Sequence, residues 1–253
     1  MPDTLVQFID VSKRYFIGEH SIRTFREDFN RAFMRVFGGY KEDKKEIWGL
    51  KDVNFSINAG DSIGLIGPNG SGKTTIFKLL SRITKVTKGR VIVNGRVGSL
   101  IDLHAGFHPE LTGLENIYLN AAIRGMKRKE IKLRVEEIVG FAGIERFKDT
   151  PLKHYSAGMC VRLGFSVAVF CPFDILIIDE VLAVGDLSFQ DKCFEKISEL
   201  QKKGKAIFFV SQDTDKVKQI TKKVIYLSFG KIVMFADAQE AINKYLEDVR
   251  GER

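Results

Sequence analysis

Residues 67–74 read GPNGSGKT, which matches the phosphate-binding pattern G-x-x-x-x-G-K-[ST]. Glycines let backbone N–H groups turn toward phosphate oxygens, and the N-terminus of a following helix favours an anion. We expect Lys73 to reach the β- and γ-phosphates of a nucleoside triphosphate, and the Thr74 hydroxyl to bind Mg²⁺. The candidate phosphate-binding residues are Gly67, Asn69, Gly70, Ser71, Gly72, Lys73, Thr74 and Thr75.

The segments on either side of this loop support the interpretation. Residues 62–66 have the pattern of a short apolar strand, and residues 75–80 have the pattern of a helix. The alternative is a glycine-rich turn that only resembles the motif, and the strand–loop–helix order disfavours it. The sequence therefore predicts that the chain binds a nucleoside triphosphate.

Two adjacent carboxylates, Asp179 and Glu180, follow the apolar run at residues 175–178. An acid at the end of a buried strand beside a phosphate loop can hold Mg²⁺, usually through water, and this role is expected for Asp179. Glu180 is placed to polarise a water molecule for attack on the γ-phosphate. A purely structural role is disfavoured, because two acids at a buried strand end are costly without a cation or polar partners.

The surrounding pattern predicts an α/β fold. The continuous apolar runs at residues 175–178 and 206–210 are typical of strands buried in a parallel sheet. Further strands are expected at residues 5–11 and 50–57, a strand and turn at 89–95, and a hairpin at 224–235. Helices are expected in the region 113–147, from about Cys160, and at the end of the chain over residues 238–250.

Composition restricts the class of protein without deciding its function. The chain has 253 residues, 44% hydrophobic and 28% charged, which suits one soluble α/β core. It has no apolar run long enough to cross a bilayer and no signal-peptide pattern. We interpret Cys160, Cys171 and Cys193 as reduced thiols of a cytosolic protein. The net charge of +8 fits an anionic membrane surface, a nucleic acid or simply a solvated basic surface.

Residues 21–38 form an unusual insert between the first two expected strands. Phenylalanine and other apolar residues recur there at three- and four-residue steps, with arginines between them. This pattern predicts a basic amphipathic helix that ends at Gly38 and Gly39. Its apolar face could pack on the core, or the helix could face a membrane or a partner.

The order of three motifs resembles the ATP-binding-cassette ATPases. The run YSAGM at residues 155–159 is similar to that family's LSGGQ signature, and it lies between the phosphate loop and the Asp179–Glu180 pair. The resemblance implies that Ser156 and Gly158 grip the γ-phosphate of ATP bound by a second subunit. Taken alone, Ser156 would more often be an ordinary helix N-cap.

The resemblance covers nearly the whole chain and implies its architecture. It implies one domain over residues 1–253: a P-loop NTPase core of the ATP-binding-cassette type, an antiparallel β subdomain, and a helical subdomain at about residues 111–153. Residues 183–186 are similar to the D-loop, so Asp186 is expected near the junction of the two ATP sites. Tyr15 matches the aromatic residue that stacks on adenine; the alternatives are a core tyrosine, or Phe16 in its place.

Two positions depart from the family pattern. Gln212 stands where the family usually has the switch histidine, and an amide cannot carry a proton or a positive charge. We therefore expect slower hydrolysis with ATP binding retained, whether Gln212 is natural or engineered. The usual Q-loop glutamine is also missing from residues 98–113, where Asp102 or His104 occupies the neighbourhood. Asp102 could bind Mg²⁺ through oxygen.

The segments 105–118, 155–159 and 180–186 together resemble the polysaccharide-export branch of the family. Members export lipid-linked O-antigen, capsule or teichoic acid. The resemblance implies a homodimer of ATPase chains at the cytoplasmic face of the inner membrane, joined to two separate transmembrane subunits, with the lipid-linked glycan as indirect cargo. Three alternatives are a drug or lipid exporter, a soluble cassette protein acting on ribosomes or DNA, and a non-catalytic nucleotide switch. We expect no nucleic-acid partner, since neither a second cassette nor a long coiled coil is present.

Overall fold

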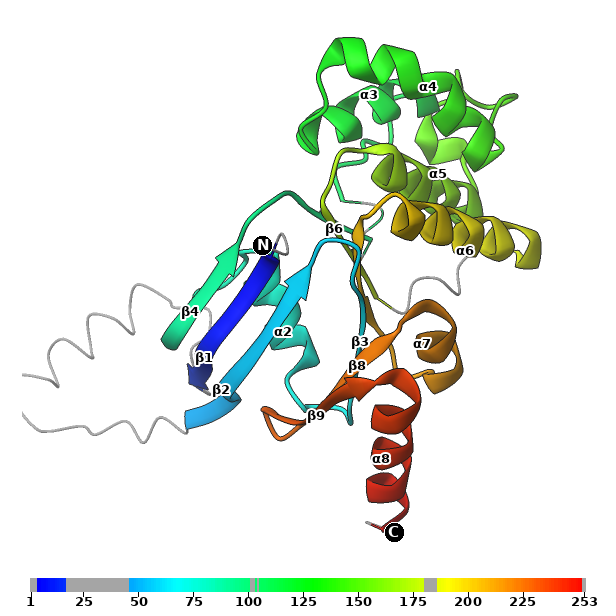
Figure 1. The fold of residues 1–253 in the computed structure, drawn as a ribbon. Coiled ribbons are helices and arrows are strands. Elements are labelled where there is room, and N and C mark those ends of the chain that lie inside the picture. The colour runs from blue at the N-terminus through cyan, green and yellow to red at the C-terminus, as the bar shows by residue number, and fades with distance from the viewer. Residues whose placement is uncertain (1–3, 17–45, 101–102, 104, 180–185, 252–253) are drawn as a thin grey trace, which may run out of the picture.

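The computed structural model describes residues 4–16, 46–100, 103, 105–179 and 186–251. The insert expected to be helical at residues 21–38 lies outside this part of the chain. Asp102, His104, Glu180 and residues 183–185 of the expected D-loop also lie outside it. The described residues form two sheets with helices packed around them (Figure 1).

The smaller sheet is antiparallel. Its order is β2-β1-β4, formed by Glu46–Asn58, Thr4–Phe16 and Lys88–Val93. The Phe8 and Phe55 rings stack with their centroids 4.3 Å apart, and Phe55 lies 6.3 Å from Phe208 of the larger sheet. The strands expected at residues 5–11 and 50–57 are therefore confirmed, and their buried aromatic face attaches this sheet to the rest of the core.

The larger sheet has the order β5-β6-β7-β3-β8-β9, and only its last pair is antiparallel. Its strands are Val97–Ser99, Ile175–Ile178, Ala206–Val210, Ser62–Ile66, Lys223–Ser228 and Lys231–Asp237. Every residue of β3, β6 and β7 is buried, which explains their continuous apolar runs. Because parallel strands share a direction, the segments that follow β3, β6 and β7 emerge at one edge of the sheet.

Among the described residues, four helices belong to this core: α2 (Lys73–Leu80), α6 (Leu187–Lys202), α7 (Thr214–Ile220) and α8 (Ala238–Gly251). The predicted hairpin is formed by β8 and β9, and the predicted terminal helix is α8. Helix α8 packs through Ala238, Ala241 and Ile242, and its Tyr245 ring lies 5.3 Å from Tyr226 of β8.

A helical region lies at the opposite end of the molecule from α8 (Figure 1). It contains α3 (Gly113–Ile123), α4 (Arg128–Ala142), a short 3-10 helix at Leu152–His154, and α5 (Ala157–Phe170). A capping box formed by Thr112 and Glu115 starts α3, and Gly143 in the left-handed conformation ends α4. The prediction that α5 starts near Cys160 is three residues late, because the Ser156 hydroxyl accepts from Met159 N and starts the helix at Ala157.

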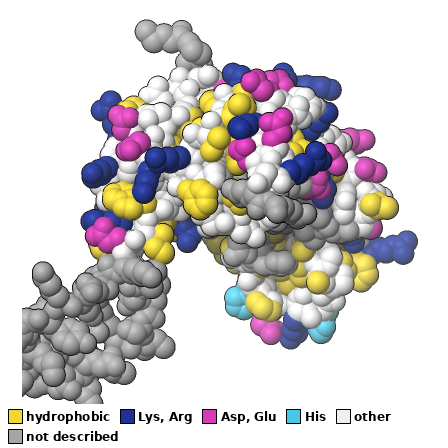
Figure 2. Space-filling view, turned by 90° about the horizontal axis from the view of Figure 1, so that it is seen from below, with side chains coloured by type: hydrophobic (Ala, Val, Ile, Leu, Met, Phe, Trp, Pro, Cys, Tyr) yellow, Lys and Arg dark blue, Asp and Glu magenta, His cyan; other side chains and the backbone are white. Residues whose placement is uncertain are grey.

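The surface seen from the α8 end mixes both signs of charge. Figure 2 shows Lys and Arg side chains interspersed with Asp and Glu side chains on this face. One such pair lies on α8, where Lys244 Nζ is 2.8 Å from Asp248 Oδ1. Across the described residues, no helix combines the length and apolar character that a membrane crossing requires.

Candidate nucleotide site

A pocket of about 580 Å³ lies at the edge of the larger sheet where β3, β6 and β7 end. Residues from five separate segments line it, and most of the predicted site residues that the structure describes are among them. The predicted residues that line it are Tyr15, Asn69, Gly70, Gly72, Lys73, Thr74, Thr75, Asp179 and Gln212.

The phosphate loop needs its glycines for backbone shape and for space. Gly67, Gly70 and Gly72 all have positive φ angles, of 148°, 79° and 111°. A Cβ atom on Gly67 would lie 2.0 Å from the carbonyl oxygen of Leu227, and one on Gly72 would lie 2.4 Å from that of Gly49. Gly67 and the buried Ser71 are not lining residues: Gly67 packs against Leu227 of β8, and Ser71 O accepts from Gly230 N of the β8–β9 turn.

The loop presents positive charge to the pocket. Lys73 Nζ donates to the backbone carbonyl oxygens of Gly67 and Pro68, at 2.7 and 3.0 Å, which places its ammonium group across the loop. Helix α2 begins here with neither a side-chain cap nor an acid in its first turn, so its N-terminus favours an anion. The Thr74 side chain is exposed, whereas Thr75 is buried.

Asp179 and Gln212 reach the same pocket from two neighbouring strands. Asp179 directly follows β6, and Gln212 is the second residue after the end of β7. Gln212 Nε2 donates to Asn69 Oδ1 of the phosphate loop at 3.1 Å. The amide at position 212 is therefore placed where it can touch a phosphate group held by the loop.

Tyr15 forms part of the pocket wall. Its hydroxyl donates to Thr75 Oγ1 at 3.5 Å, and Lys13 Nζ lies 5.1 Å from the centre of its ring. Phe16, the alternative aromatic residue, is not a lining residue; the Arg14 guanidinium lies 4.9 Å from its ring instead. The strand geometry thus places Tyr15, and not Phe16, in the pocket.

Gly49 is a lining residue that the sequence analysis did not identify. Lys13 pairs with Leu50 while Arg14 pairs with Trp48, so Gly49 is the extra residue of a bulge in β2. A Cβ atom on Gly49 would lie 2.8 Å from Tyr15 Cε2. The sequence signal that could have identified it is a glycine inside a strand pattern, which often marks a β-bulge or a site where another part of the chain or a ligand approaches the backbone closely.

Ser156 and Gly158 lie outside this pocket. Ser156 is the N-cap of α5, so within a single chain its side chain acts as an ordinary helix cap. Among the described residues, and apart from the backbone of its own helix, a Cβ atom on Gly158 would meet only Ser156 Oγ, 3.9 Å away. Packing within this part of the chain therefore gives little reason for a glycine at position 158.

Asp186, at the end of the expected D-loop, contacts helix α5, which begins at Ala157. Its Oδ1 accepts from Phe189 N at 2.9 Å and caps α6. Its Oδ2 lies 3.9 Å from Nη1 of Arg162, which is on α5. A movement of α5 would therefore change the contact between Arg162 and Asp186.

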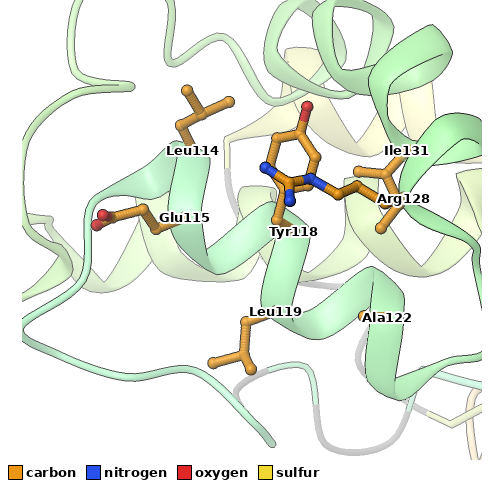
Figure 3. A pocket seen from close by; sticks show the side chains of 7 residues that line it. All are labelled: Leu114, Glu115, Tyr118, Leu119, Ala122, Arg128 and Ile131. Carbon is orange, nitrogen blue, oxygen red and sulfur yellow. The ribbon is translucent and has the colours of Figure 1, made fainter.

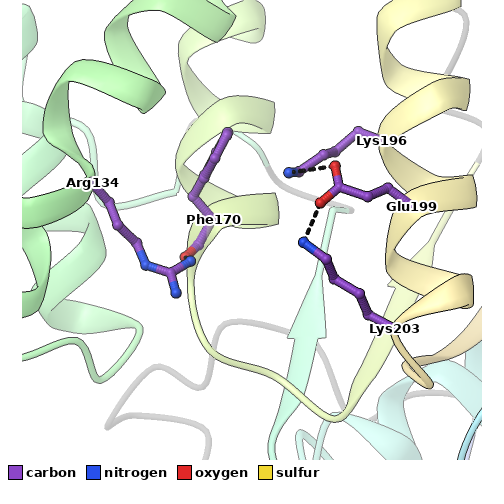
Figure 4. A network of polar contacts seen from close by, with 5 residues as sticks. All are labelled: Arg134, Phe170, Lys196, Glu199 and Lys203. Carbon is purple, nitrogen blue, oxygen red and sulfur yellow. Dashed lines mark hydrogen bonds and ion pairs between the residues drawn. The ribbon is translucent and has the colours of Figure 1, made fainter.

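Contacts connect the middle of α4 to the C-terminal end of α5, and α5 to α6 (Figure 4). Arg134 Nη1 donates to the carbonyl oxygen of Phe170 at 3.1 Å, and Lys196 Nζ lies 4.4 Å from the Phe170 ring. Hydrogen bonds from Lys203 and Lys196 lower the pKa of Glu199. The Lys196–Phe170 contact links α6 of the core to α5 of the helical region, whereas the Glu199 contacts lie at the end of α6 itself.

Comparison with known proteins places this site in a family. The family model described as "ABC transporter" matches residues 50–183. The O-antigen export system ATP-binding protein RfbB of Klebsiella pneumoniae is 41% identical over 246 residues, which cover 96% of this chain and 98% of that protein. The teichoic acids export ATP-binding protein TagH of Listeria monocytogenes is 40% identical over 97% of this chain and 70% of its own length.

Solved structures agree on the fold. An ATP-binding cassette dimer bound to ADP and phosphate has a TM-score of 0.70 at 22% identity, covering 92% of this chain and 98% of that one. An ATP-binding subunit of an ABC transporter has a TM-score of 0.74 at 20% identity, covering 98% and 99%. The expected cassette-type core, with its antiparallel and helical parts, is confirmed.

Replacing Gly49 by Ala should weaken ATP binding about fivefold, because the new methyl group displaces the Tyr15 ring and removes about 1 kcal/mol of stacking. Titration with a fluorescent ATP analogue measures the change. Gly140→Ala, on an open face of α4, is the matched control and should leave affinity unchanged. Equal affinity in both variants would show that Gly49 does not position Tyr15.

Proposed function

The chain belongs to the ABC transporter family as an ATP-hydrolysing cassette, and we propose that it powers export of a lipid-linked polysaccharide across the bacterial inner membrane. One observation carries the proposal. A single pocket joins Tyr15, the phosphate loop, Asp179 and Gln212, in a chain that matches an O-antigen export ATP-binding protein over nearly its full length.

ATP binding follows from the residues around the pocket. Adenine stacks on Tyr15, the loop N–H groups and Lys73 hold the phosphates, and Gln212 contacts the γ-phosphate side. The Thr74 hydroxyl and the Asp179 carboxylate supply oxygen ligands of the kind that Mg²⁺ prefers, and Asp102 is a third candidate. Mg²⁺ held there would neutralise charge on the phosphates.

Hydrolysis is assigned to Glu180, which follows Asp179 in the chain. Its carboxylate polarises the attacking water and accepts a proton from it as the γ-phosphate is transferred. Gln212 orients that water through its amide but cannot stabilise the developing negative charge with a positive charge of its own. We therefore assign tight binding and slow turnover to this chain.

A second copy of the chain completes the site. Ser156 is exposed at the start of α5 and lies outside its own chain's ATP pocket, so it is free to face the pocket of a partner. The Ser156 hydroxyl and the N–H groups of the first turn of α5 then grip the partner's γ-phosphate, and Gly158 allows the close approach. Asp186 lies next to this interface through its contact with Arg162.

The membrane subunits are proposed to dock on the helical region. A groove of about 490 Å³ lies between α3 and α4 and is lined by Leu114, Glu115, Tyr118, Leu119, Ala122, Arg128 and Ile131 (Figure 3). Its apolar floor and charged ends suit a short amphipathic helix. Closure of the ATPase dimer would shift this groove and move two separate permease subunits at the cytoplasmic face of the membrane. The glycan is then cargo that the ATPase does not itself enclose.

Replacing Glu180 by Gln should lower the steady-state ATPase rate at least about a hundredfold, because the base for the attacking water is lost. ATP affinity should stay within about twofold, because the phosphate contacts remain. The measurement pairs an ATPase assay with a binding titration. Retention of the parent rate would remove Glu180 from the catalytic role.

Restoring histidine with Gln212→His should raise kcat on the order of tenfold, because imidazole can carry the charge that the amide cannot. Gln212→Ala is the control and should not raise the rate. The comparison uses kcat at saturating Mg·ATP, together with the ATP dissociation constant. No rise in the histidine variant would mean that residue 212 does not limit turnover.

A charge placed in the groove should break transporter assembly. Leu119→Glu, with a parent side chain 36% exposed on α3, should abolish co-purification with the membrane subunit while leaving ATP binding intact. Leu133→Glu on α4 is the matched control, because Leu133 is 81% exposed and lies outside the groove. Equal co-purification of the two variants would place the docking site elsewhere. Co-purification of this chain with a permease that does not export a glycan would overturn the proposed cargo.

A further inference from the structure

Tyr155, the residue directly before Ser156, is anchored through its side chain. Its hydroxyl donates to the carbonyl oxygen of Phe147 at 2.7 Å. Its ring is half-buried and packs against buried apolar residues of the core. Tyr155 is a lining residue of neither the ATP pocket nor the groove between α3 and α4, so neither of these sites explains the tyrosine.

Gly113, the first residue of α3, fits closely against this side chain. A Cβ atom on Gly113 would lie 2.1 Å from the hydroxyl oxygen of Tyr155 and 3.1 Å from its Cζ atom. Any larger residue at position 113 would therefore displace the tyrosine ring. Glycine is a poor helix former, and the contact with Tyr155 explains its presence at the start of this helix.

The segment that leads to Ser156 is fastened to the segment that leads into α3. Four backbone hydrogen bonds of 2.8, 3.1, 3.0 and 2.9 Å connect the two segments, from Leu114 N to Lys148 O, Gly113 N to Thr150 O, Leu152 N to Leu111 O and Lys153 N to Pro109 O. The hydrogen bond from Tyr155 to Phe147 joins the two ends of the second segment, directly before α5 begins. The position of Tyr155 is thereby fixed relative to α3.

Ser156 follows Tyr155 without any intervening turn. Tyr155 and Ser156 both have extended backbone conformations, and the Tyr155 N–H donates to Leu152 O. The Ser156 hydroxyl accepts from Met159 N at 3.2 Å, which fixes it to the first turn of α5. The direction in which the exposed Ser156 and this first turn face therefore depends on where the Tyr155 ring is held.

The Tyr155 hydroxyl is a donor under the conditions of an ATPase assay. Burial, with smaller contributions from Cys160 and Asp149, raises the pKa of Tyr155 to about 12. The hydroxyl therefore keeps its proton near neutral pH. Phenylalanine at this position would keep the ring and lose only the hydrogen bond to Phe147.

We propose that Tyr155 is a positioning residue for the γ-phosphate of ATP bound by a second copy of the chain, and that it acts through Ser156. The inference rests on the proposed shared site, in which Ser156 faces the partner's pocket. A symmetric dimer contains this arrangement twice. Because Tyr155 lies outside the ATP pocket of its own chain, its loss should weaken dimer formation and leave ATP binding to a single chain intact.

The test introduces Tyr155→Phe into the Glu180→Gln protein. The dimer dissociation constant, measured by sedimentation equilibrium with saturating Mg·ATP, should rise about tenfold, because each of two sites loses one hydrogen bond. ATP affinity, measured with a fluorescent analogue at concentrations where the chain is monomeric, should stay within about twofold. Tyr245→Phe is the matched control: it removes a hydroxyl from α8, at the other end of the molecule, and should change neither quantity.

A second variant tests the contact between Gly113 and Tyr155 directly. Gly113→Ala should raise the dimer dissociation constant at least about tenfold when Tyr155 is present, because the new methyl group collides with the hydroxyl oxygen. In the Tyr155→Phe background that oxygen is gone, so the same change should raise the constant less than about threefold. Additive effects of the two substitutions would show that the contact does not set the position of Ser156.

Equal dimer dissociation constants for the Tyr155→Phe and Tyr245→Phe proteins would overturn the inference. A matching loss of ATP affinity in the Tyr155→Phe monomer would also overturn it, since Tyr155 would then support only the fold. Both results leave the proposed shared site standing. If the Glu180→Gln parent itself does not dimerise with Mg·ATP, the shared site is wrong, and this inference is wrong with it.

Discussion

The ATP pocket depends on the close approach of three glycine backbones: Gly72 of the phosphate loop, Gly49 of β2 and Gly230 of the β8–β9 turn. A Cβ atom on Gly72 would lie 2.4 Å from the carbonyl oxygen of Gly49, and one on Gly230 would lie 2.9 Å from the same atom. Gly230 N donates to Ser71 O at 2.9 Å, and Lys51 N donates to Gly230 O at 2.8 Å. The phosphate loop, strand β2 and the β8–β9 hairpin are thereby fixed together, and Tyr15 is brought over the loop.

The helical region is attached to this rigid core in a different way. One link to the core runs through α5, which carries Ser156 at one end and contacts α4 and α6 at the other. Arg162 connects the same helix to Asp186. If Ser156 binds a γ-phosphate as proposed, the force acts on one helix that contacts both Asp186 and the other helices of the helical region, and nucleotide binding is thereby converted into movement.

Much of this could be predicted from the sequence, because the signals are local. Buried strands are continuous apolar runs, and the phosphate loop is a contiguous motif between a strand and a helix. Contacts that depend on register or on distant segments could not be predicted: the bulge at Gly49, the bond from Gln212 to Asn69, and the contact between Gly113 and Tyr155. Tyr15 and Phe16 stayed alternatives for the same reason, since strand register decides which one faces the pocket. The roles of Ser156, Gly158 and Glu180 remain predictions.

The central claim is that ATP is shared between two copies of the chain. Sedimentation velocity of the Glu180→Gln variant tests it most directly, because bound ATP is not consumed. The account predicts that the Glu180→Gln protein is a dimer with Mg·ATP and a monomer with Mg·ADP. When Ser156→Arg is added, the protein should be a monomer with either nucleotide, since the larger side chain blocks the exposed start of α5. A Glu180→Gln protein that stays monomeric with its nucleotide site filled by ATP would contradict the account.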